Sequence, residues 1–291
     1  MTTVAVAARR SGAVRPDGAP VPVVLMADGD EVGTGWVRLD PGGALGRPTA
    51  TTWAPRLRPG LDGATRAAAF DAFAGWVVST AAAAGSATVE TKPADDVAHL
   101  SEWLAALRRH GFAEVAVAHL LTRGLPVAGA PGPPYPGLAV APLDGLRGAD
   151  RLAVEALVTT VHRTTADRVD ALDRLAGADV LARLAGDRVA MPAPRLWLVA
   201  TAGARPVGYV LGSVDGDDVW VMDVGVDPAE RGRGIGRWLL TTMLAGAGPA
   251  RRARALVDDE NLPSRRLHTA AGFAEERGAY RTWRLRPPGP G

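Results

Sequence analysis

The stretch VWVMDVGVDPAERGRGIGRWLL, residues 219–240, decides how the rest of the chain is interpreted. It begins with an apolar segment, Val219–Val226, that is typical of a β-strand. A polar turn rich in glycine and arginine follows, and Trp238, Leu239 and Leu240 then lie at the spacing of a helix core. The stretch therefore predicts a strand, a tight turn and a helix in succession.

The turn, residues 231–237, has the properties of an anion-binding site. Glycines expose backbone N–H groups, and the dipole of a helix that starts here adds positive potential. Arg231, Arg233 and Arg237 add formal charge, so a pyrophosphate is a suitable ligand. A glycine-rich surface turn is the simpler alternative. A dinucleotide fingerprint does not fit, because its last glycine would fall at Arg237, and a Walker loop would need a lysine.

The same turn closely resembles the acyl-CoA-binding motif of the GNAT (GCN5-related) N-acetyltransferases, Arg/Gln-x-x-Gly-x-Gly/Ala. Arg231, Gly234 and Gly236 occupy the motif positions. The resemblance implies that acetyl-CoA binds along the strand and the turn. The implied contacts are Val224, Gly225, Val226, Arg231, Gly232, Arg233, Gly234, Ile235, Gly236 and Arg237.

A second family signature is similar to DDENLPSRRLHTAAGF, residues 258–273. By this likeness Asn261 touches coenzyme A, although Asn261 and Ser264 also suit helix capping. His268 stands where the family usually has a tyrosine that protonates the departing CoA thiolate. A histidine can donate that proton, hydrogen-bond the sulfur, or be an ordinary helix residue.

Direct transfer to an amine needs a polarised thioester and a group that receives the ammonium proton. In the family a backbone N–H of the strand polarises the carbonyl, which places Val224 and Val226 beside the thioester. Asp223 is the candidate base, or alternatively a cap for a neighbouring element. Strand alternation predicts that Asp223 lies opposite Val224 and on the same face as Gly225 and Val221.

The other histidines are weaker candidates. By family likeness His162 lies on a helix that borders the acceptor site, but a packing role suits it equally. His99, His110 and His119 have no metal-ligand spacing, and we expect them to be structural. No metal site is predicted.

Composition limits the class of protein. The chain has 291 residues, of which 47% are hydrophobic, so a packed globular protein is expected. The absence of cysteine excludes disulfides and thiolate chemistry and is compatible with a cytoplasmic protein. A net charge of +2 argues against nucleic-acid binding, and no apolar run is long enough for a membrane helix.

The chain contains an internal repeat. Gly111-Phe112-Ala113-Glu114 recurs as Gly272-Phe273-Ala274-Glu275, and a matching order of strands and helices precedes each copy. We therefore predict an α/β protein of two tandem GNAT folds, each a mixed, mostly antiparallel sheet flanked by helices. The predicted parts are a degenerate unit at 1–125, a Pro/Gly-rich linker at 126–137, a cofactor-binding unit at 138–286, and a disordered tail at 287–291.

The predicted elements follow from hydrophobic periodicity. The helices are Ala64–Ala84, Asp95–His110, Arg151–Thr165, Ala166–Leu184, the helix ending near Ala245, and Pro263–Ala271. The strands are Thr3–Ala8, Val21–Ala27, Glu31–Leu39, Thr49–Leu57, Ala87–Thr91, Ala113–Leu121, Leu138–Pro142, Leu196–Thr201, Val207–Val214, Val219–Val226, Ala253–Asp258 and Tyr280–Leu285. The first unit has Leu61 where the motif needs glycine, so we expect no cofactor there.

The resemblance implies an N-acetyltransferase that moves an acetyl group from acetyl-CoA to a primary amine of a small molecule or peptide by direct attack. A non-catalytic acyl-CoA sensor and a transferase for longer acyl-CoA remain alternatives. We expect a monomer or homodimer without nucleic-acid or membrane partners.

Overall fold

The structure is a computed structural model that describes residues 4–8, 20–40, 48–127, 129–173, 177–186 and 195–285. The chain divides into two compact units. Unit 1 comprises residues 1–117 and 278–291, and unit 2 comprises residues 118–277. Among the described residues, no helix is both long and apolar enough to cross a membrane.

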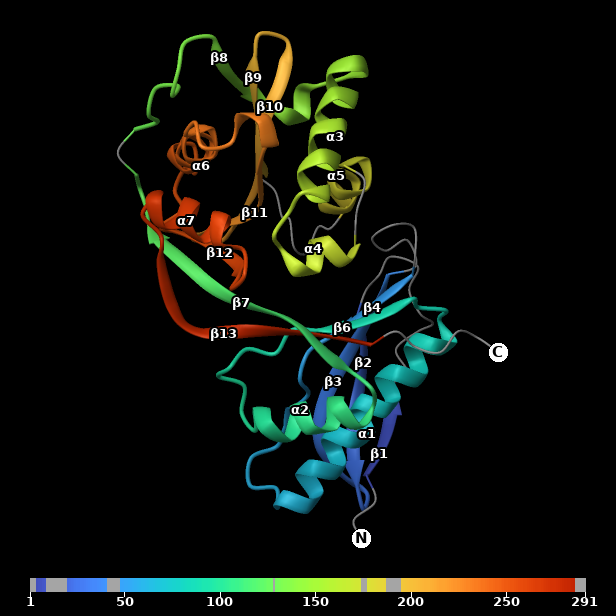
Figure 1. The fold of residues 1–291 in the computed structure, drawn as a ribbon. Coiled ribbons are helices and arrows are strands. Elements are labelled where there is room, and N and C mark those ends of the chain that lie inside the picture. Colours follow the sequence, from blue (N-terminus) through green and yellow to red (C-terminus); the bar gives the residue numbers. More distant parts are fainter. Residues whose placement is uncertain are drawn as a thin grey trace. The chain divides into compact units, whose positions relative to one another are not determined.

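Unit 1 is a mixed sheet covered by two helices (Figure 1). Its elements are β1 (Val4–Ala8), β2 (Val21–Ala27), β3 (Asp30–Asp40), β4 (Thr49–Thr52), β5 (Arg56–Leu57), α1 (Gly63–Ala83), β6 (Thr88–Thr91), α2 (Leu100–Arg109) and the first part of β7 (Ala113–Gly124). Strands β1 to β4 pair antiparallel in sequence order, and β4 and β6 pair in parallel. Phe70 and Phe73 of α1 pack with Trp103 of α2 to form the core.

The first backbone N–H groups of α1 are hydrogen-bonded to a side chain of the preceding residue. Asp62 caps the helix, and its Oδ1 accepts hydrogen bonds of 2.9 Å from the backbone N–H groups of Ala64 and Thr65. These bonds, together with one from the Thr65 hydroxyl, lower the pKa of Asp62. A carboxylate therefore occupies the position at which an anionic ligand would bind a free helix start.

Unit 2 is a second mixed sheet, in the order β7-β12-β11-β10-β9-β8. Its strands are β8 (Leu138–Pro142), β9 (Arg195–Ala202), β10 (Arg205–Asp215), β11 (Asp218–Val226), β12 (Arg252–Asp258) and the later residues of β7. All neighbours are antiparallel except β11 and β12. That parallel pair is in register only from Asp218–Val221 and Arg252–Ala255, so the two strands separate beyond these residues.

Helices cover both faces of this sheet (Figure 1). α3 (Gly148–Arg163), α4 (Arg168–Asp173) and α5 (Gly177–Gly186) lie on one side, and α6 (Ile235–Ala245) and α7 (Leu262–Ala270) on the other. Ile235, Leu239 and Met243 of α6 are buried in the main core of the unit. The 3.6-residue spacing of these side chains explains why the segment forms a helix on the sheet.

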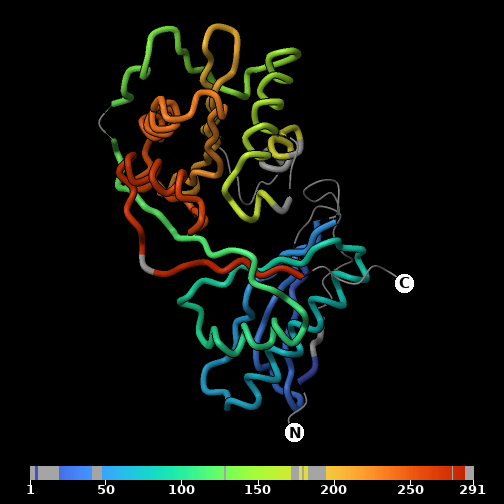
Figure 2. Tube along the Cα trace, viewed as in Figure 1, coloured from blue at the N-terminus to red at the C-terminus, as the bar shows by residue number. Residues whose placement is uncertain are grey.

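The domain boundaries differ from the prediction. The last strand, β13 (Ala274–Leu285), begins in unit 2, and its final residues pair with β6 in unit 1. Strand β7 likewise starts in unit 1 and continues in unit 2, as the chain trace shows (Figure 2). Hydrophobic patterning identifies a strand but not which unit it joins, so the boundaries at 125 and 138 were wrong.

The prediction of an interdomain linker at 126–137 also differs from the structure. The described residues of 126–137 belong to unit 2, where Val127 and Tyr135 pack against the core. The indole N–H of Trp238 donates to the Pro131 carbonyl at 3.1 Å. Proline prevents regular structure here but does not prevent packing, so the segment is a strap over α6 rather than a spacer.

Three predicted elements are shorter or divided. The predicted strand Thr49–Leu57 is two strands, β4 and β5. The predicted helix over 166–184 is α4 and α5. Helix α2 begins at Leu100 rather than Asp95, because Ala94 and Asp95 pair with β13 instead. The predicted disordered tail lies outside the described residues.

Candidate active site

A cavity of about 390 Å³ opens in unit 2 where β11 and β12 separate. The end of β11 from Met222 to Val226 forms one wall, and β12 contributes Ala255, Leu256 and Val257. On the β12 side, no described strand pairs with this part of β11. The exposed strand edge leaves backbone groups available to an extended ligand, as in β-augmentation.

The start of α6 faces the same cavity. Gly232 and Gly234 have positive φ angles of 77° and 85°, a conformation that favours glycine. Gly234 is the N-cap residue and supplies no side-chain hydrogen bond, in contrast to Asp62 at α1. The first N–H groups of α6 are therefore open to an anion at the cavity edge.

The three arginines of the turn have different surroundings. Arg237 is exposed, lines the cavity and has no ion-pair partner among the described residues. Arg231 also lines the cavity, but its guanidinium donates to the Val226 carbonyl at 3.2 Å and the Thr164 hydroxyl at 2.8 Å. Arg233 points elsewhere: it pairs with Glu230 at 2.5 Å and lies over the Tyr135 ring.

Arg233 was predicted to contact the cofactor, but it is absent from the cavity wall. Its partner Glu230 also binds Arg205 and accepts from the Tyr135 hydroxyl at 3.1 Å. Burial alone would raise the pKa of Glu230, but hydrogen bonds from Arg205 and Tyr135 lower it. Glu230 thus stays ionised and holds Arg233, which anchors the turn instead of lining the cavity.

Asp223 lies at the other end of the cavity in a shared polar centre. Its Oδ2 atom accepts from the Tyr209 hydroxyl at 3.0 Å and contacts His162 Nε2 at 2.9 Å. His162 is 4% exposed, and its Nδ1 lies 3.8 Å from Asp170 Oδ2. The second oxygen of Asp223, Oδ1, has no hydrogen-bond partner among the described residues. The carboxylate is therefore held through one oxygen and open at the other.

Tyr209 is a site residue that sequence analysis missed. It is fully buried, and burial, followed by the Asp223 charge, raises the pKa of its hydroxyl well above the ordinary value. The group remains a hydrogen-bond donor at any physiological pH. A Cβ on Gly225 would lie as close as 2.5 Å to the Tyr209 ring, so glycine at 225 is needed for this ring to lie under β11. No motif marks Tyr209, although it pairs with Gly225 across two adjacent predicted strands.

The predicted face of Asp223 was partly wrong. Asp223 does lie on the face of Gly225, where both contact Tyr209. However, Asp223 pairs with Leu211 while Val221 pairs with Gly212, which leaves Met222 as an extra residue. This β-bulge reverses the alternation, so Val221 lies on the opposite face, in the core with α6. Sequence periodicity cannot reveal one inserted residue.

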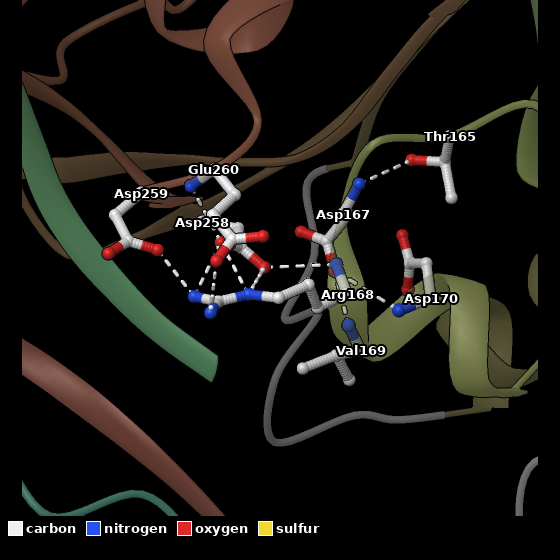
Figure 3. A network of polar contacts seen from close by, with 8 residues as sticks. All are labelled: Thr165, Asp167, Arg168, Val169, Asp170, Asp258, Asp259 and Glu260. Atoms are coloured by element: carbon white, nitrogen blue, oxygen red, sulfur yellow. Dashed lines mark hydrogen bonds and ion pairs between the residues drawn. The ribbon is translucent and has the colours of Figure 1, made fainter. Parts of the chain in front are cut away.

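Arg168, the first residue of α4, lies at the centre of a network of polar contacts with the end of β12 (Figure 3). Its guanidinium binds Asp258 through bonds of 2.9–3.1 Å and also pairs with Asp259 and Glu260. Burial alone would raise the pKa of Asp258, but the Arg168 hydrogen bonds hold it below the ordinary value. The clamp joins α4 to the end of β12, and Asp170 follows within the same turn of α4.

Asn261, the N-cap residue of α7, and His268, within α7, both lie at the cavity wall. Asn261 caps the helix by accepting from the Ser264 N–H at 3.2 Å, which is the alternative that the sequence left open. His268 is 2% exposed, and its Nδ1 lies 2.9 Å from the Ser264 carbonyl oxygen. Burial lowers the pKa of His268. The other ring nitrogen, Nε2, is buried, and none of the described residues forms a hydrogen bond with it.

The remaining predicted cofactor residues also lie at this cavity. Its lining includes Val224, Gly225, Val226, Gly232, Gly234, Ile235 and Gly236. His99, His110 and His119 are absent from the lining, and the latter two pair with Asp71 and Glu275. The described residues contain no cluster of His, Cys, Asp and Glu suited to a metal ion.

Comparison with known families identifies the domain around this cavity. Residues 170–273 match the model of the acetyltransferase (GNAT) family. The chain therefore contains a GNAT-family domain, and acyl transfer is the general activity of that family. The matched segment includes β11, the α6 turn and α7. Comparison with curated proteins finds no significant match.

Solved structures share this fold over most of the chain. A GCN5-related N-acetyltransferase from Sphaerobacter thermophilus is 20% identical with a TM-score of 0.60, over 92% of this chain and 82% of that one. A tandem GNAT protein from the clavulanic acid biosynthesis pathway is 16% identical with a TM-score of 0.59, over 95% and 86%. The α/β fold with tandem GNAT units is thus confirmed.

Proposed function

We propose that this protein transfers an acetyl group from acetyl-CoA to a primary amine of a small molecule or peptide. The observation that carries the proposal is one cavity with an open helix start at one end and an open carboxylate oxygen at the other. The first suits the pyrophosphate of a CoA ester, and the second suits an ammonium group. The free edge of β11 connects them.

The residues present fit a CoA ester. The N–H groups of Ile235 and Gly236 would hold phosphate oxygens, with Arg237 supplying charge. The pantetheine amides would pair with the backbone of β11 between Val224 and Val226, because β12 leaves that edge unpaired. A Cβ at Gly236 would already contact the side chains of Leu267 and Val226 at 3.4 Å, so a side chain longer than alanine would have to take up space beside the helix start.

Asp223 would receive the acceptor. Its Oδ1 would bind the ammonium group and take one proton, which leaves a neutral amine for direct attack on the thioester carbonyl. Tyr209 and His162 hold Oδ2, so the carboxylate is already oriented when the amine arrives. This preorganisation removes part of the entropic cost of a productive encounter.

The direct test is CoA release from acetyl-CoA with a panel of primary amines. Turnover with at least one amine is the expected result. Tight CoA binding with no turnover would favour a sensor, and turnover only with longer acyl-CoA would move the proposal to a different donor.

A matched pair of variants tests the cofactor position. Gly234→Asp and Gly234→Asn impose the same backbone strain and both side chains can cap α6, but only Asp adds a negative charge. We expect Gly234→Asp to bind CoA at least about tenfold more weakly than Gly234→Asn, measured by isothermal titration calorimetry. Equal affinities would contradict the assignment of phosphate to this helix start.

A further inference from the structure

His268 is a buried polar residue in a position where the fold does not need one. The internal repeat supplies the comparison: the N–H of Phe273 donates to the His268 carbonyl at 3.0 Å, and the N–H of Phe112 donates to the Leu107 carbonyl at 3.0 Å. Leu107 is therefore the counterpart of His268 in unit 1, and it is fully buried in an apolar core. An apolar residue is sufficient for packing at this helix position. Packing therefore does not explain why unit 2 has an imidazole there.

The hydrogen bonds of the ring define its tautomer. A carbonyl oxygen can only accept, so the 2.9 Å contact with the Ser264 carbonyl requires a hydrogen on Nδ1. The Ser264 hydroxyl lies farther away, at 3.3 Å. A neutral ring with hydrogen on Nδ1 presents a bare lone pair at Nε2. Nε2 is buried and has no hydrogen-bond partner in the described part of the chain, and His268 lines the cavity.

The resting ring therefore cannot donate a proton from Nε2, which is the role expected from the family tyrosine. We propose instead that His268 Nε2 is a proton shuttle, which first takes a proton from the attacking amine and then delivers it to the departing CoA thiolate. This inference rests on the proposed function and deepens it.

The step balances without another reactant. Attack forms the C–N bond, and the amine nitrogen, now positively charged, gives its proton to Nε2. Collapse breaks the C–S bond, and its electron pair leaves with sulfur as a thiolate. The imidazolium then returns the Nε2 proton to the sulfur, giving an amide, free CoA and the original neutral histidine. Asp223 handles the earlier ammonium proton, so the two groups have separate tasks.

The surroundings of His268 suit both halves of this cycle. Burial lowers its pKa, so the ring is neutral at pH 7 before attack and Nε2 has a lone pair that can accept a proton. Among the described residues, Ser264 is the only hydrogen-bond partner of the ring, and the Phe273 ring packs edge-on with its centroid 5.1 Å away. No described carboxylate stabilises the imidazolium once it forms, so it loses its proton readily to a nearby thiolate.

The tautomer can be tested without turnover. The full chain, labelled with ¹⁵N at histidine, would be examined by long-range ¹⁵N–¹H NMR at pH 7.5, with His268 assigned by the signal lost in His268→Gln. We expect a proton on Nδ1 and none on Nε2. A proton on Nε2 in the resting protein would overturn the shuttle.

The pH dependence of kcat tests the proton transfer. An acceptor amine of low basicity, unprotonated throughout the range, removes the ionisation of the substrate. The shuttle predicts that kcat falls on the acid side as Nε2 becomes protonated. His268→Gln should lower kcat by about 100-fold or more and abolish that limb, with unchanged CoA affinity as the check on folding. His119→Gln, a histidine of the same unit outside the cavity, is the matched control.

Two results would overturn the shuttle while leaving the proposed function intact. One is a fall in kcat on the alkaline side that disappears in His268→Gln, because this pattern belongs to a proton donor. The other is wild-type kcat in His268→Tyr, because a phenol that only donates would then suffice. Absence of turnover with every amine would instead contradict the proposed function.

Discussion

Tyr209→Phe is the most informative change in the polar centre around Asp223. The ring contacts under Gly225 remain, so no cavity forms, and the variant removes only the hydroxyl that donates to Asp223 Oδ2 at 3.0 Å. A hydrogen bond to a charged acceptor contributes about 1.5–3 kcal/mol. We therefore expect Tyr209→Phe to lower the free energy of unfolding by that amount, measured by urea denaturation.

A double-mutant cycle with Asp223→Asn isolates the pair. The neutral amide oxygen still accepts from Tyr209, but a neutral hydrogen bond contributes only about 0.5–1.5 kcal/mol. The coupling energy should therefore be about 1 kcal/mol or slightly more. CoA affinity should be unchanged, because Tyr209 does not line the cavity. Additive effects within experimental error would refute the interpretation that Tyr209 supports the charge of Asp223.

Three further changes test other parts of the site. Asp223→Asn should lower kcat/KM for the amine by about 100-fold or more with CoA affinity retained; near-normal kcat/KM would exclude Asp223 as the proton acceptor. Arg168→Gln should cost about 2–3 kcal/mol in urea denaturation, because it leaves Asp258 buried beside a neutral partner; a smaller loss would mean that α4 is held by other contacts. The lowered pKa of His268 means that the unfolded chain binds the proton more readily, so stability is full above about pH 6.5 and falls as the pH drops through the lowered value. His268→Leu should remove this part of the pH dependence of Tm, and an unchanged slope would contradict the burial of a neutral ring.

The sequence predicted β11, the glycine-rich turn and α6 because each depends on local chemistry. β11 begins one residue before the predicted strand and ends at the predicted residue, Val226. α6 ends at Ala245, where the sequence predicted its end. The opposite end of the site depends on contacts between distant residues. His162 and Asp223 are 61 positions apart, and only the packing of α3 on β10 and β11 brings them together.

Two other features could not be predicted for different physical reasons. The bulge at Met222 inserts one residue into an otherwise regular strand, and no residue type is required there. The passage of β7 and β13 between the units depends on which strand edges are free to pair, and hydrophobic alternation is the same for either partner. Arg233 shows a third limit of sequence analysis. An arginine near a predicted binding turn can form an ion pair with a neighbour, here Glu230, and the sequence does not reveal this.

The starts of α1 and α6 differ in the groups that they present to an anion. In unit 1 the N-cap of α1 is Asp62, whose carboxylate takes the first N–H groups for itself. In unit 2 the N-cap of α6 is Gly234, which has no side chain to compete for them. The prediction of no cofactor in unit 1 was based on Leu61, which stands at a glycine position of the motif. In the structure, Leu61 is partly buried against the core of unit 1. The neighbouring Asp62 carboxylate is the stronger reason to expect no cofactor in unit 1, because a negative charge at a helix start repels phosphate.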